Sequence, residues 1–536
     1  MQLNTQGIKD RAQWEKAGIK LPAYDIQAMI KAGTENPVWV HFGAGNIFRA
    51  FPAAIQQRLL EEGASDTGII VAEAYDYEII DALFKPCDNL SLLVTLKSDG
   101  STEKTVIAGI AQALRADTAC RDFETLQSIF RKPCLQMASF TITEKGYSLS
   151  SGSGAFMQDV EQDFRAGPEK PQSYMGKVAS LLHLRYKAGA LPIAMVSMDN
   201  CSHNGDRLAE AMQTFARKWQ ENGHADAGFG AYLKNPQKAS FPWSMIDKIT
   251  PRPDDSVKAM LVAGGLEGAQ GCMTAKGTYI APFVNAEETQ YLVIENQFPN
   301  GCPLLEKGGV IFTDRQTVDM VEKMKVCTCL NPLHTALAIF GCLLGYTRIS
   351  EEMKNPNLVK LIEGIGYTEG LPVVSDPGII SPKKFIDEVI QIRLPNPFMP
   401  DTPQRIATDS SLKIPIRFGE TIKAYMASAS LKTSELKLIP LVLAAWLRYL
   451  LGIDDQGKEF PISPDPQIEV IVPQLAGIKL GQKGPFHTAL APILSNPKYF
   501  AVNLYEAGLG ERVEAYFEEL LAGPGAVAAA LEKYTA

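Results

Sequence analysis

The sequence predicts an α/β protein, with an amino-terminal domain built on a parallel sheet and a mainly α-helical carboxy-terminal domain. Short apolar runs alternate with helical segments as far as residue 300, and this alternation is typical of a parallel sheet covered by helices on both faces. Helical periodicity then dominates to the end of the chain. The turn at Pro299-Asn300-Gly301 is the expected boundary, so the predicted domains are residues 1–300 and 301–536.

The predicted strands of the first domain are short and apolar. The first, 38–42, precedes a glycine-containing turn and a predicted helix over 46–62, whose apolar residues recur on one side. A hairpin is expected around the polar turn 98–101. The other predicted strands are 68–72, 92–96, 105–108, 138–142 and 192–197.

The second domain is predicted to consist almost entirely of helices. Gly and Pro are frequent over 453–485, which favours surface connections there. The predicted helices are 316–325, 332–346, 355–364, 383–393, 417–430, 434–451, 486–495 and 508–533.

Composition excludes several classes of protein. Hydrophobic residues make up 46% of the 536 residues and charged residues 21%, as in ordinary globular proteins. The net charge of −8 disfavours nucleic acid as a partner. The first residues lack the apolar core of a secretory signal, and the apolar runs 336–346 and 438–451 are expected to be buried helices, so we expect no membrane. Nine cysteines without a CxxC pair favour free thiols in the cytoplasm.

A dinucleotide-binding motif is indicated where the first strand meets the first long helix. Gly43-x-Gly45 lies between them, where the first glycine permits a tight turn and the second lets the backbone approach a pyrophosphate. A third glycine is usual in this motif, and Phe48 stands in its place. The motif predicts a Rossmann-type domain, and the cofactor-binding candidates at the helix start are Asn46, Ile47, Phe48 and Arg49.

The acidic residue that ends the second strand favours NAD over NADP. Glu73 lies 28 residues after Gly45, where a carboxylate can bind the ribose hydroxyls and repel the additional phosphate of NADP. Asp76 is a competing candidate for the same contact. A tight strand-to-helix turn followed by a solvated glutamate would produce the same pattern without a cofactor.

A cluster of polar residues near the start of the second domain is the candidate catalytic centre. Asn331 and His334 are three residues apart and would share one helix face, and Lys325 precedes them. A desolvated lysine can exchange protons near neutral pH, and an amide can hold an oxygen that gains charge. Each residue, taken by itself, also has an explanation without catalysis. Lys325 could be a solvated surface lysine, Asn331 a helix cap and His334 a histidine buried in the core. With Cys327 and Cys329, His334 lacks the second ligand pair of a zinc site, so no metal is predicted.

Several polar and glycine-containing motifs follow one another along the chain. They are 42–51 (FGAGNIFRAF), 141–147 (TITEKGY), 199–206 (DNCSHNGD), 245–251 (MIDKITP), 293–301 (VIENQFPNG) and 409–415 (DSSLKIP). Together these motifs resemble the mannitol dehydrogenase family of long-chain polyol and sugar-acid dehydrogenases. The resemblance covers most of the chain and implies a Rossmann-type first domain, a helical second domain and metal-independent hydride transfer involving NAD(P).

The resemblance also implies a role for individual residues. Lys325 would be the general acid/base, and Asn331 and Asn200 would hold the reacting oxygen. His334 would orient the substrate. Glu144 would relay protons to solvent, and Asp247 would bind substrate hydroxyls.

The chain departs from the family pattern at the lysine. The family places four residues between the lysine and the asparagine, whereas five separate Lys325 from Asn331. A one-residue insertion in a bulged helical turn would reconcile the two spacings. Lys323 is the alternative catalytic lysine.

Within the family, the chain looks closest to members that reduce D-fructuronate to D-mannonate with NADH. A sugar acid needs a cation for its carboxylate, and Lys413 and Arg417 lie near the segment that resembles the family's substrate-side loop. Asp247 and Asn296 would suit the hydroxyls of a neutral polyol equally well.

Other functions remain open on the sequence alone. They are a tagaturonate reductase, a polyol 2-dehydrogenase acting on mannitol or arabinitol, an epimerase that retains NAD, and a non-catalytic nucleotide sensor. We expect a monomer or a small homo-oligomer.

Overall fold

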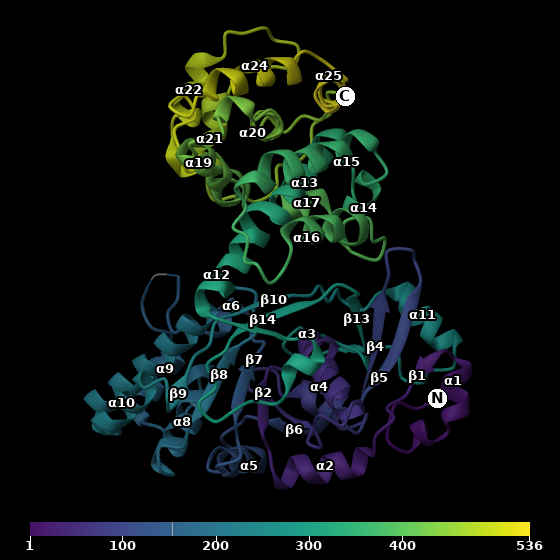
Figure 1. The fold of residues 1–536 in the computed structure, drawn as a ribbon, viewed down its shortest axis with the longest axis vertical. Coiled ribbons are helices and arrows are strands. Elements are labelled where there is room, and N and C mark those ends of the chain that lie inside the picture. The colour runs from purple at the N-terminus through teal and green to yellow at the C-terminus, as the bar shows by residue number, and fades with distance from the viewer. Residues whose placement is uncertain (153) are drawn as a thin grey trace. The chain divides into compact units, whose positions relative to one another are not determined.

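The structure, a computed structural model, describes residues 1–152 and 154–536 and divides into two compact units (Figure 1). Unit 1 comprises Met1–Lys97 and Ser101–Asp319, and unit 2 comprises Ser98–Gly100 and Met320–Ala536. The division falls after the expected boundary at residue 300. Strand β15 (Ile311–Thr313) pairs in parallel with β14 (Tyr291–Glu295), and this pairing keeps the intervening residues in unit 1.

A six-stranded parallel sheet forms the centre of unit 1, as predicted. Its strand order is β6-β3-β2-β7-β8-β9, and every neighbouring pair is parallel. The bounds are β2 Trp39–Phe42, β3 Ile69–Glu73, β6 Ile110–Arg115, β7 Met137–Phe140, β8 Ile193–Ser197 and β9 Ala239–Ser240.

Both faces of this sheet are buried, because side chains alternate along each strand. In β3, Ile70 and Ala72 join a core shared with helices α2, α5, α8 and α9, whereas Ile69 and Val71 join a second core shared with α3 and α4. The helices of unit 1 are α1 Arg11–Lys16, α2 Ile26–Glu35, α3 Asn46–Ala50, α4 Pro52–Glu61, α5 Arg121–Phe130, α6 Thr143–Gly146, α7 Gln158–Ala166, α8 Tyr174–Lys187, α9 Asn204–Glu221, α10 Ala227–Lys234 and α11 Asp255–Ala263.

The predicted helix over 46–62 is divided into α3 and α4. Phe51 leaves the helical conformation, with φ −129° and ψ −69°, and Pro52 begins α4. Proline lacks an N–H and fits the first position of a helix better than its interior, which explains the break.

Smaller sheets complete unit 1. The predicted hairpin is present as antiparallel β4 (Ser91–Leu96) and β5 (Thr102–Ile107), in a sheet of order β1-β5-β4-β13. A second sheet has the order β10-β14-β15, and β11 pairs with β12 as a separate hairpin. The remaining bounds are β1 Ile19–Lys20, β10 Ser244–Asp247, β11 Cys272–Met273, β12 Tyr279–Ile280 and β13 Phe283–Glu287.

Unit 2 is helical, as predicted, and α13 and α20 lie in its core with most of their residues buried. The predicted helix over 508–533 is two helices, separated by a turn in which Gly525 has φ +82°. Within 453–485 the structure has one short α-helix, α21, followed directly by a 3-10 turn at Val472–Leu475. After α12 (Arg315–Lys323), the helices are α13 Asn331–Leu344, α14 Ile349–Glu352, α15 Pro356–Glu363, α16 Pro382–Glu388, α17 Pro403–Ile406, α18 Ser410–Ile414, α19 Glu420–Ala427, α20 Leu438–Tyr449, α21 Ile468–Ile471, α22 His487–Leu494, α23 Pro497–Phe500, α24 Gly510–Leu520 and α25 Ala526–Thr535.

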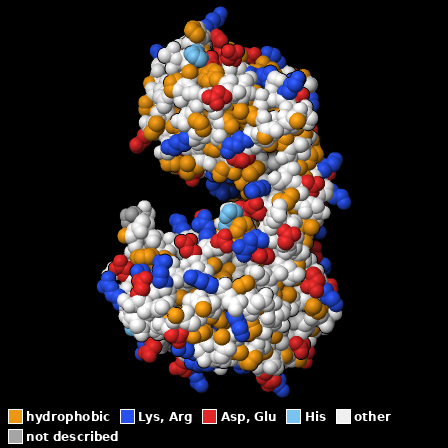
Figure 2. All heavy atoms as spheres, turned by 60° about the vertical axis from the view of Figure 1, so that its left-hand side comes forward, with side chains coloured by type: hydrophobic (Ala, Val, Ile, Leu, Met, Phe, Trp, Pro, Cys, Tyr) orange, Lys and Arg blue, Asp and Glu red, His pale blue; other side chains and the backbone are white. Residues whose placement is uncertain are grey.

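One helical stretch, Arg315–Leu344, is long and apolar enough to cross a bilayer, but 72% of its most apolar part is buried inside the molecule. Burial of this extent is what the core helix of a globular protein shows. On the surface, acidic and basic side chains are interspersed over the visible face of each unit (Figure 2).

Candidate active site

The turn after β2 has the geometry that the glycine motif predicts. Gly43 has φ +103°. A Cβ at this position would overlap the carbonyl oxygen of Thr141, the residue that directly follows the neighbouring strand β7. A Cβ on Gly45 would meet nothing within 4 Å. Gly43 is therefore required by the turn itself, whereas Gly45 leaves an open surface beside the backbone.

A cavity of about 770 Å³ lies at the carboxyl ends of β2, β3 and β7. From β2 the chain runs outward on one side through β3 to β6 and then returns as β7 on the other side of β2, and ligands of α/β proteins bind at such a reversal. The walls include Gly43, Gly45, residues 73–77, residues 141–143, Tyr174 and Lys177.

Glu73 ends β3 at the wall of this cavity. Its carboxylate accepts the backbone N–H groups of Ala44 at 3.0 Å, Tyr75 at 2.8 Å and Asp76 at 3.1 Å. A carboxylate has about four acceptor positions, so one is left for a hydroxyl of a ligand. Asp76 also lines the cavity, and its carboxylate accepts the hydroxyl of Thr274 at 2.7 Å.

The cavity wall fits a dinucleotide in three respects. Gly45 leaves room for a pyrophosphate next to the backbone, and Glu73 supplies an acceptor for a ribose hydroxyl. The hydroxyl of Tyr174 is buried on this wall without a hydrogen-bond partner among the described residues. Burial, together with the nearby Glu73 charge, raises the pKa of Tyr174 well above its ordinary value, so its hydroxyl stays a donor.

The first residues of α3 lie next to the glycine turn but not on the cavity wall. Asn46, Ile47, Phe48 and Arg49 are outside the set of residues that line the cavity. Phe48 is fully buried, with its ring stacked on His41 at 4.4 Å between centroids. The buried guanidinium of Arg49 donates to Ser91 Oγ, to the carbonyl oxygen of Ala281 and to Asn46 Oδ1. Phe48 and Arg49 thus stabilise unit 1 from its interior.

Asp199, at the end of β8, organises the neighbouring polar turn. Its carboxylate accepts the N–H groups of Ile142 and Thr143, both at 2.9 Å, and the hydroxyl of Tyr147 at 2.6 Å. Asp199 belongs to the polar motif 199–206, in which no role was predicted for it. The signal for its role is its position two residues after a buried strand.

The two candidates that adjoin this turn are accessible to solvent. Asn200 follows Asp199 and is exposed. Glu144 is also exposed, and its carboxylate forms an ion pair with Arg207 at 3.0 Å. Both therefore lie at the surface of unit 1, at the ends of parallel strands.

Asp247 and Asn296 lie at opposite ends of one strand pair. Asp247 is buried at the end of β10 and pairs with Tyr291 of antiparallel β14. Asn296 follows the other end of β14, five residues beyond Tyr291, which is about 16 Å at strand spacing. The structure therefore does not bring these two substrate-binding candidates together.

The predicted bulged turn is present at Lys325. Residues Met324–Cys329 form a π-helical turn, in which the N–H of Leu330 donates to the carbonyl oxygen of Lys325 at 3.1 Å. This five-residue step accommodates one residue more than a regular α-helical turn. The side chain of Lys325 is buried, whereas that of Lys323 is exposed. Asn331 begins α13, with Pro332 in the first turn.

His334 lies on the same face of α13 as Asn331, three residues earlier, and is surrounded by charged groups. Its Nε2 is 3.5 Å from Asp401 Oδ2 and has no hydrogen-bond partner among the described residues. Burial lowers the pKa of His334 to about 4; Asp401 opposes this shift, and three nearby arginines (Arg417, Arg405 and Arg393) add to it. The imidazole is therefore neutral at pH 7 and can both donate and accept a hydrogen bond.

The two predicted cations for a carboxylate are held differently. Arg417 Nη1 donates to Thr335 Oγ1 at 2.5 Å, next to His334 in the chain, and burial lowers the pKa of Arg417 to about 10. Lys413 Nζ donates to the carbonyl oxygens of Ile406 at 3.1 Å and Thr408 at 2.5 Å. Arg417 thus lies beside the candidate catalytic helix as a cation at neutral pH, while Lys413 fastens the end of α17.

Two family models match the chain. One is described as the mannitol dehydrogenase Rossmann domain and matches residues 38–307, and the other, the mannitol dehydrogenase C-terminal domain, matches residues 317–520. A D-mannonate oxidoreductase of Thermotoga maritima is 54% identical over 535 residues, which cover 99% of each protein.

Two solved structures resemble the whole chain. A substrate-free D-sorbitol dehydrogenase has a TM-score of 0.79 at 26% identity, over 96% of this chain and 98% of that one. A Pseudomonas fluorescens mannitol 2-dehydrogenase, in a ternary complex with NAD and D-mannitol, has a TM-score of 0.69 at 26% identity, over 99% of both chains.

Proposed function

The chain belongs to the mannitol dehydrogenase family, and from this premise we propose that it reduces D-fructuronate with NADH to D-mannonate and NAD, and catalyses the reverse oxidation. It is an oxidoreductase that acts on a CH–OH group. The observation that carries the choice of substrate is the 54% identity, over nearly the full length of both proteins, to a D-mannonate oxidoreductase.

The cofactor would be held by the cavity of unit 1. Gly43 and Gly45 would take the pyrophosphate, Glu73 the ribose, and Tyr174 would donate to an oxygen of the nucleotide. When bound, NADH supplies the hydride that reduces the carbonyl carbon. Use of NAD in preference to NADP is supported by the carboxylate of Glu73 on the cavity wall.

Lys325 would be the general acid/base. In the reductive direction its ammonium gives a proton to the carbonyl oxygen, and in the oxidative direction its amine takes that proton back. Asn331 and Asn200 would donate hydrogen bonds to this oxygen as its charge develops. The neutral His334 would orient the substrate, Glu144 would exchange the proton with solvent, and Asp247 would bind substrate hydroxyls.

The carboxylate of a sugar acid would be held by Arg417. This proposal is supported by the three arginines whose charges act on His334, since they make the surroundings of α13 favourable for an anion. A neutral polyol has no carboxylate, so the charges of these arginines would contribute less to its binding. Reduction of D-tagaturonate would use the same cations, so it is the nearest competing reaction.

A polyol 2-dehydrogenase is the second candidate. It is favoured by the resemblance to the D-sorbitol and mannitol dehydrogenase structures, at TM-scores of 0.79 and 0.69. We further propose a cytoplasmic location, which is supported by nine cysteines that are all free.

The test is oxidation of NADH by the purified protein, followed by the loss of NADH absorbance, without added metal. D-Fructuronate, D-tagaturonate, D-fructose and D-xylulose form the substrate panel. We expect turnover with D-fructuronate to exceed that with the other three. Faster turnover of fructose or xylulose would establish the polyol reaction instead, and NADH binding without oxidation of any substrate would favour an epimerase or a sensor.

A further inference from the structure

The β11–β12 hairpin is fastened to the loop that follows β3. We refer to residues 272–280 as the strap and to residues 74–78 as the β3 loop. Thr274 Oγ1 donates to Asp76 Oδ2 at 2.7 Å, and both residues are buried. The N–H of Ala275 donates to Glu78 Oε2 at 2.8 Å. Two separate hydrogen bonds thus join segments that are about 200 residues apart in the chain.

Lys276, at the tip of the strap, contacts Tyr75 in two ways. Its Nζ donates to the carbonyl oxygen of Tyr75 at 2.5 Å and lies 4.1 Å from the centroid of the Tyr75 ring. Tyr75 is nevertheless 60% exposed, and both side chains belong to residues that line the cofactor cavity. The pair therefore presents an aromatic ring and an ammonium group to a ligand.

The β3 loop is also held from its other side. Lys177 Nζ, on α8, donates to the carbonyl oxygen of Ala74 at 3.1 Å and to the hydroxyl of Tyr77 at 2.6 Å. The hydroxyl of Tyr77 donates in turn to the carbonyl oxygen of Ala116 at 3.3 Å, just after β6.

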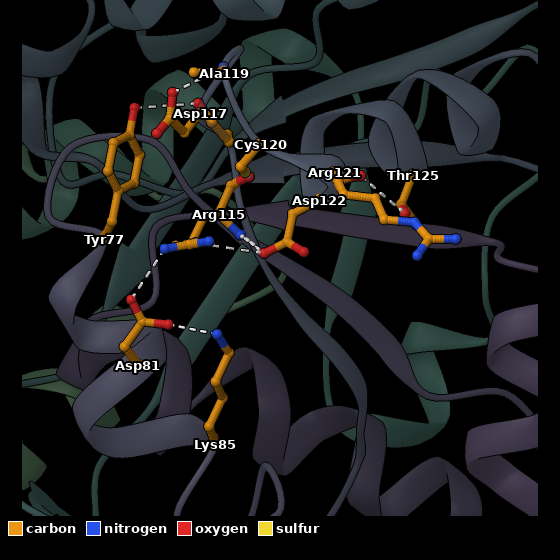
Figure 3. A network of polar contacts seen from close by, with 11 residues as sticks. Tyr77, Asp81, Lys85, Arg115, Asp117, Ala119, Cys120, Arg121, Asp122 and Thr125 are labelled. Carbon is orange, nitrogen blue, oxygen red and sulfur yellow. Dashed lines mark hydrogen bonds and ion pairs between the residues drawn. The ribbon is translucent and has the colours of Figure 1, made fainter.

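Further ion pairs lie next to this loop, at the end of β6. Arg115, the last residue of β6, pairs with Asp81 at 3.3 Å and with Asp122 at 3.7 Å (Figure 3). Since the β3 loop is fixed from both sides, Tyr75 is positioned before any ligand arrives, and the entropic penalty of binding is smaller.

The order of groups along the cavity assigns this pair to one end of a dinucleotide. Gly43 and Gly45 mark the pyrophosphate end, and Glu73 the ribose. Glu73 lies between the glycine turn and Tyr75, since its Oε2 accepts the N–H of Ala44 and its Oε1 accepts the N–H of Tyr75. We propose that Tyr75 and Lys276 bind the adenosine half of the cofactor, with the adenine ring packed against Tyr75 and Lys276 covering the edge of the site.

This inference rests on the proposed use of NAD. It adds two binding residues and one structural element, the strap, to that function. A purely structural role is the competing explanation, in which Lys276 only fastens the strap. The two explanations differ in what they predict for stability, because a loosened strap would lower the melting temperature of Lys276→Ala, whereas loss of a ligand contact alone would not.

The test is calorimetric titration of the cofactor-free protein with AMP and with nicotinamide mononucleotide, together with NADH binding followed by fluorescence. For Lys276→Ala and for Tyr75→Ala we expect the affinity for AMP and for NADH to fall about 5-fold, as for loss of one stacking or cation–π contact. The affinity for nicotinamide mononucleotide should stay unchanged. Lys276→Arg should restore AMP binding, since a guanidinium keeps the charge and also packs on aromatic rings.

Lys258→Ala is the matched control. Lys258 lies on α11, where it pairs with Asp255 at 2.6 Å, and it is outside the residues that line the cavity. The control should bind all three ligands as the wild type does. Thermal unfolding of each variant checks that it is folded.

The outcomes separate this inference from the proposed function. Wild-type binding of NADH and AMP with no loss in the two alanine variants would overturn the inference alone. Equal losses for AMP and nicotinamide mononucleotide would also overturn it, in favour of a structural role. A wild-type protein that binds neither NADH nor AMP would overturn the inference and the proposed function together.

Discussion

The carboxylate of Glu73 accepts the backbone N–H of Ala44 at 3.0 Å, which joins the end of β3 to the glycine turn after β2. One side chain therefore stabilises the turn that would receive the pyrophosphate and, at the same wall, offers an acceptor for the ribose. Substitutions of Glu73 should consequently affect both stability and the choice of cofactor.

We predict that Glu73→Ala lowers kcat/KM with NADH by about 10-fold and raises kcat/KM with NADPH, since the repulsion of the additional phosphate is removed. The variant should also lose about 1–3 kcal/mol of stability, because three backbone N–H groups lose their acceptor. Steady-state kinetics with both cofactors and thermal unfolding measure the two effects. If only Asp76→Ala changed the discrimination, the ribose contact would belong to Asp76.

The two glycines of the turn should respond differently to alanine. Gly45→Ala should keep the melting temperature of the wild type but weaken NADH binding at least about 10-fold, because its Cβ meets no protein atom and would occupy cofactor space. Gly43→Ala should lower the melting temperature as well, since it combines a positive φ with overlap of Thr141. A Gly45→Ala variant with unchanged NADH affinity would contradict the proposed cofactor position.

The π-helical turn makes Lys325 the expected proton donor. Lys325→Ala should reduce kcat by at least about 100-fold with little change in NADH affinity, because a general acid acts on the chemical step. Lys323→Ala, two residues away and exposed, is the control and should retain most activity. Stopped-flow turnover and NADH titration measure the two quantities. An inactive Lys323→Ala beside an active Lys325→Ala would reverse the assignment.

Arg417 should discriminate acids from neutral sugars. Arg417→Ala should raise KM for D-fructuronate about 10- to 100-fold through loss of a charged hydrogen bond, and should change the reduction of a neutral ketose less. Lys413→Ala provides the comparison, because Lys413 is engaged with two backbone carbonyls. A larger KM effect in the Lys413 variant would transfer the carboxylate contact to Lys413.

Glu352 should make stability depend on pH. Its side chain is fully buried against α13, neither oxygen has a hydrogen-bond partner among the described residues, and burial raises its pKa from 4.5 to about 9. The folded chain therefore keeps a proton that the unfolded chain releases, so this contribution is complete below pH 4.5 and is lost by up to about 1.4 kcal/mol per pH unit as pH rises to 9.

The measurement is the melting temperature of Glu352→Gln relative to the wild type, at pH 5 and at pH 8. The stabilisation by glutamine should be clearly larger at pH 8. Glu351→Gln is the control, since Glu351 is an exposed neighbour paired with Lys354 at 2.8 Å. Equal effects of Glu352→Gln at the two pH values would contradict a protonated Glu352.

Local sequence patterns predicted most of the fold. Buried parallel strands are short apolar runs, so β2, β3, β7 and β8 were visible in the sequence, as was the hairpin of β4 and β5. The structure divides after Asp319, because β15 pairs with β14, and this pairing has no local signal in the sequence. The break at Phe51 had a local signal in Pro52, but the periodicity on either side concealed it.

The candidate site was less predictable, because its contacts join distant segments. Asp401, Arg393 and Arg405 affect His334 from at least 59 residues away in the chain, and no spacing rule links them. Arg49 follows the glycine turn, where a cofactor contact is a reasonable expectation, but its hydrogen bonds go to Ser91 and Ala281 inside unit 1. Only the three-dimensional structure could assign these side chains.

The π-helical turn at Met324–Cys329 also determines how this segment can tolerate a change in length. An additional residue in a regular α-helix rotates everything beyond it by about 100°, which would turn His334 away from its neighbours. Here the surplus residue is absorbed within the π-helical turn. Deletion of Val326 would restore a four-residue interval between the lysine and Asn331, so the segment should tolerate this deletion, although elsewhere in a buried helix a deletion would be disruptive.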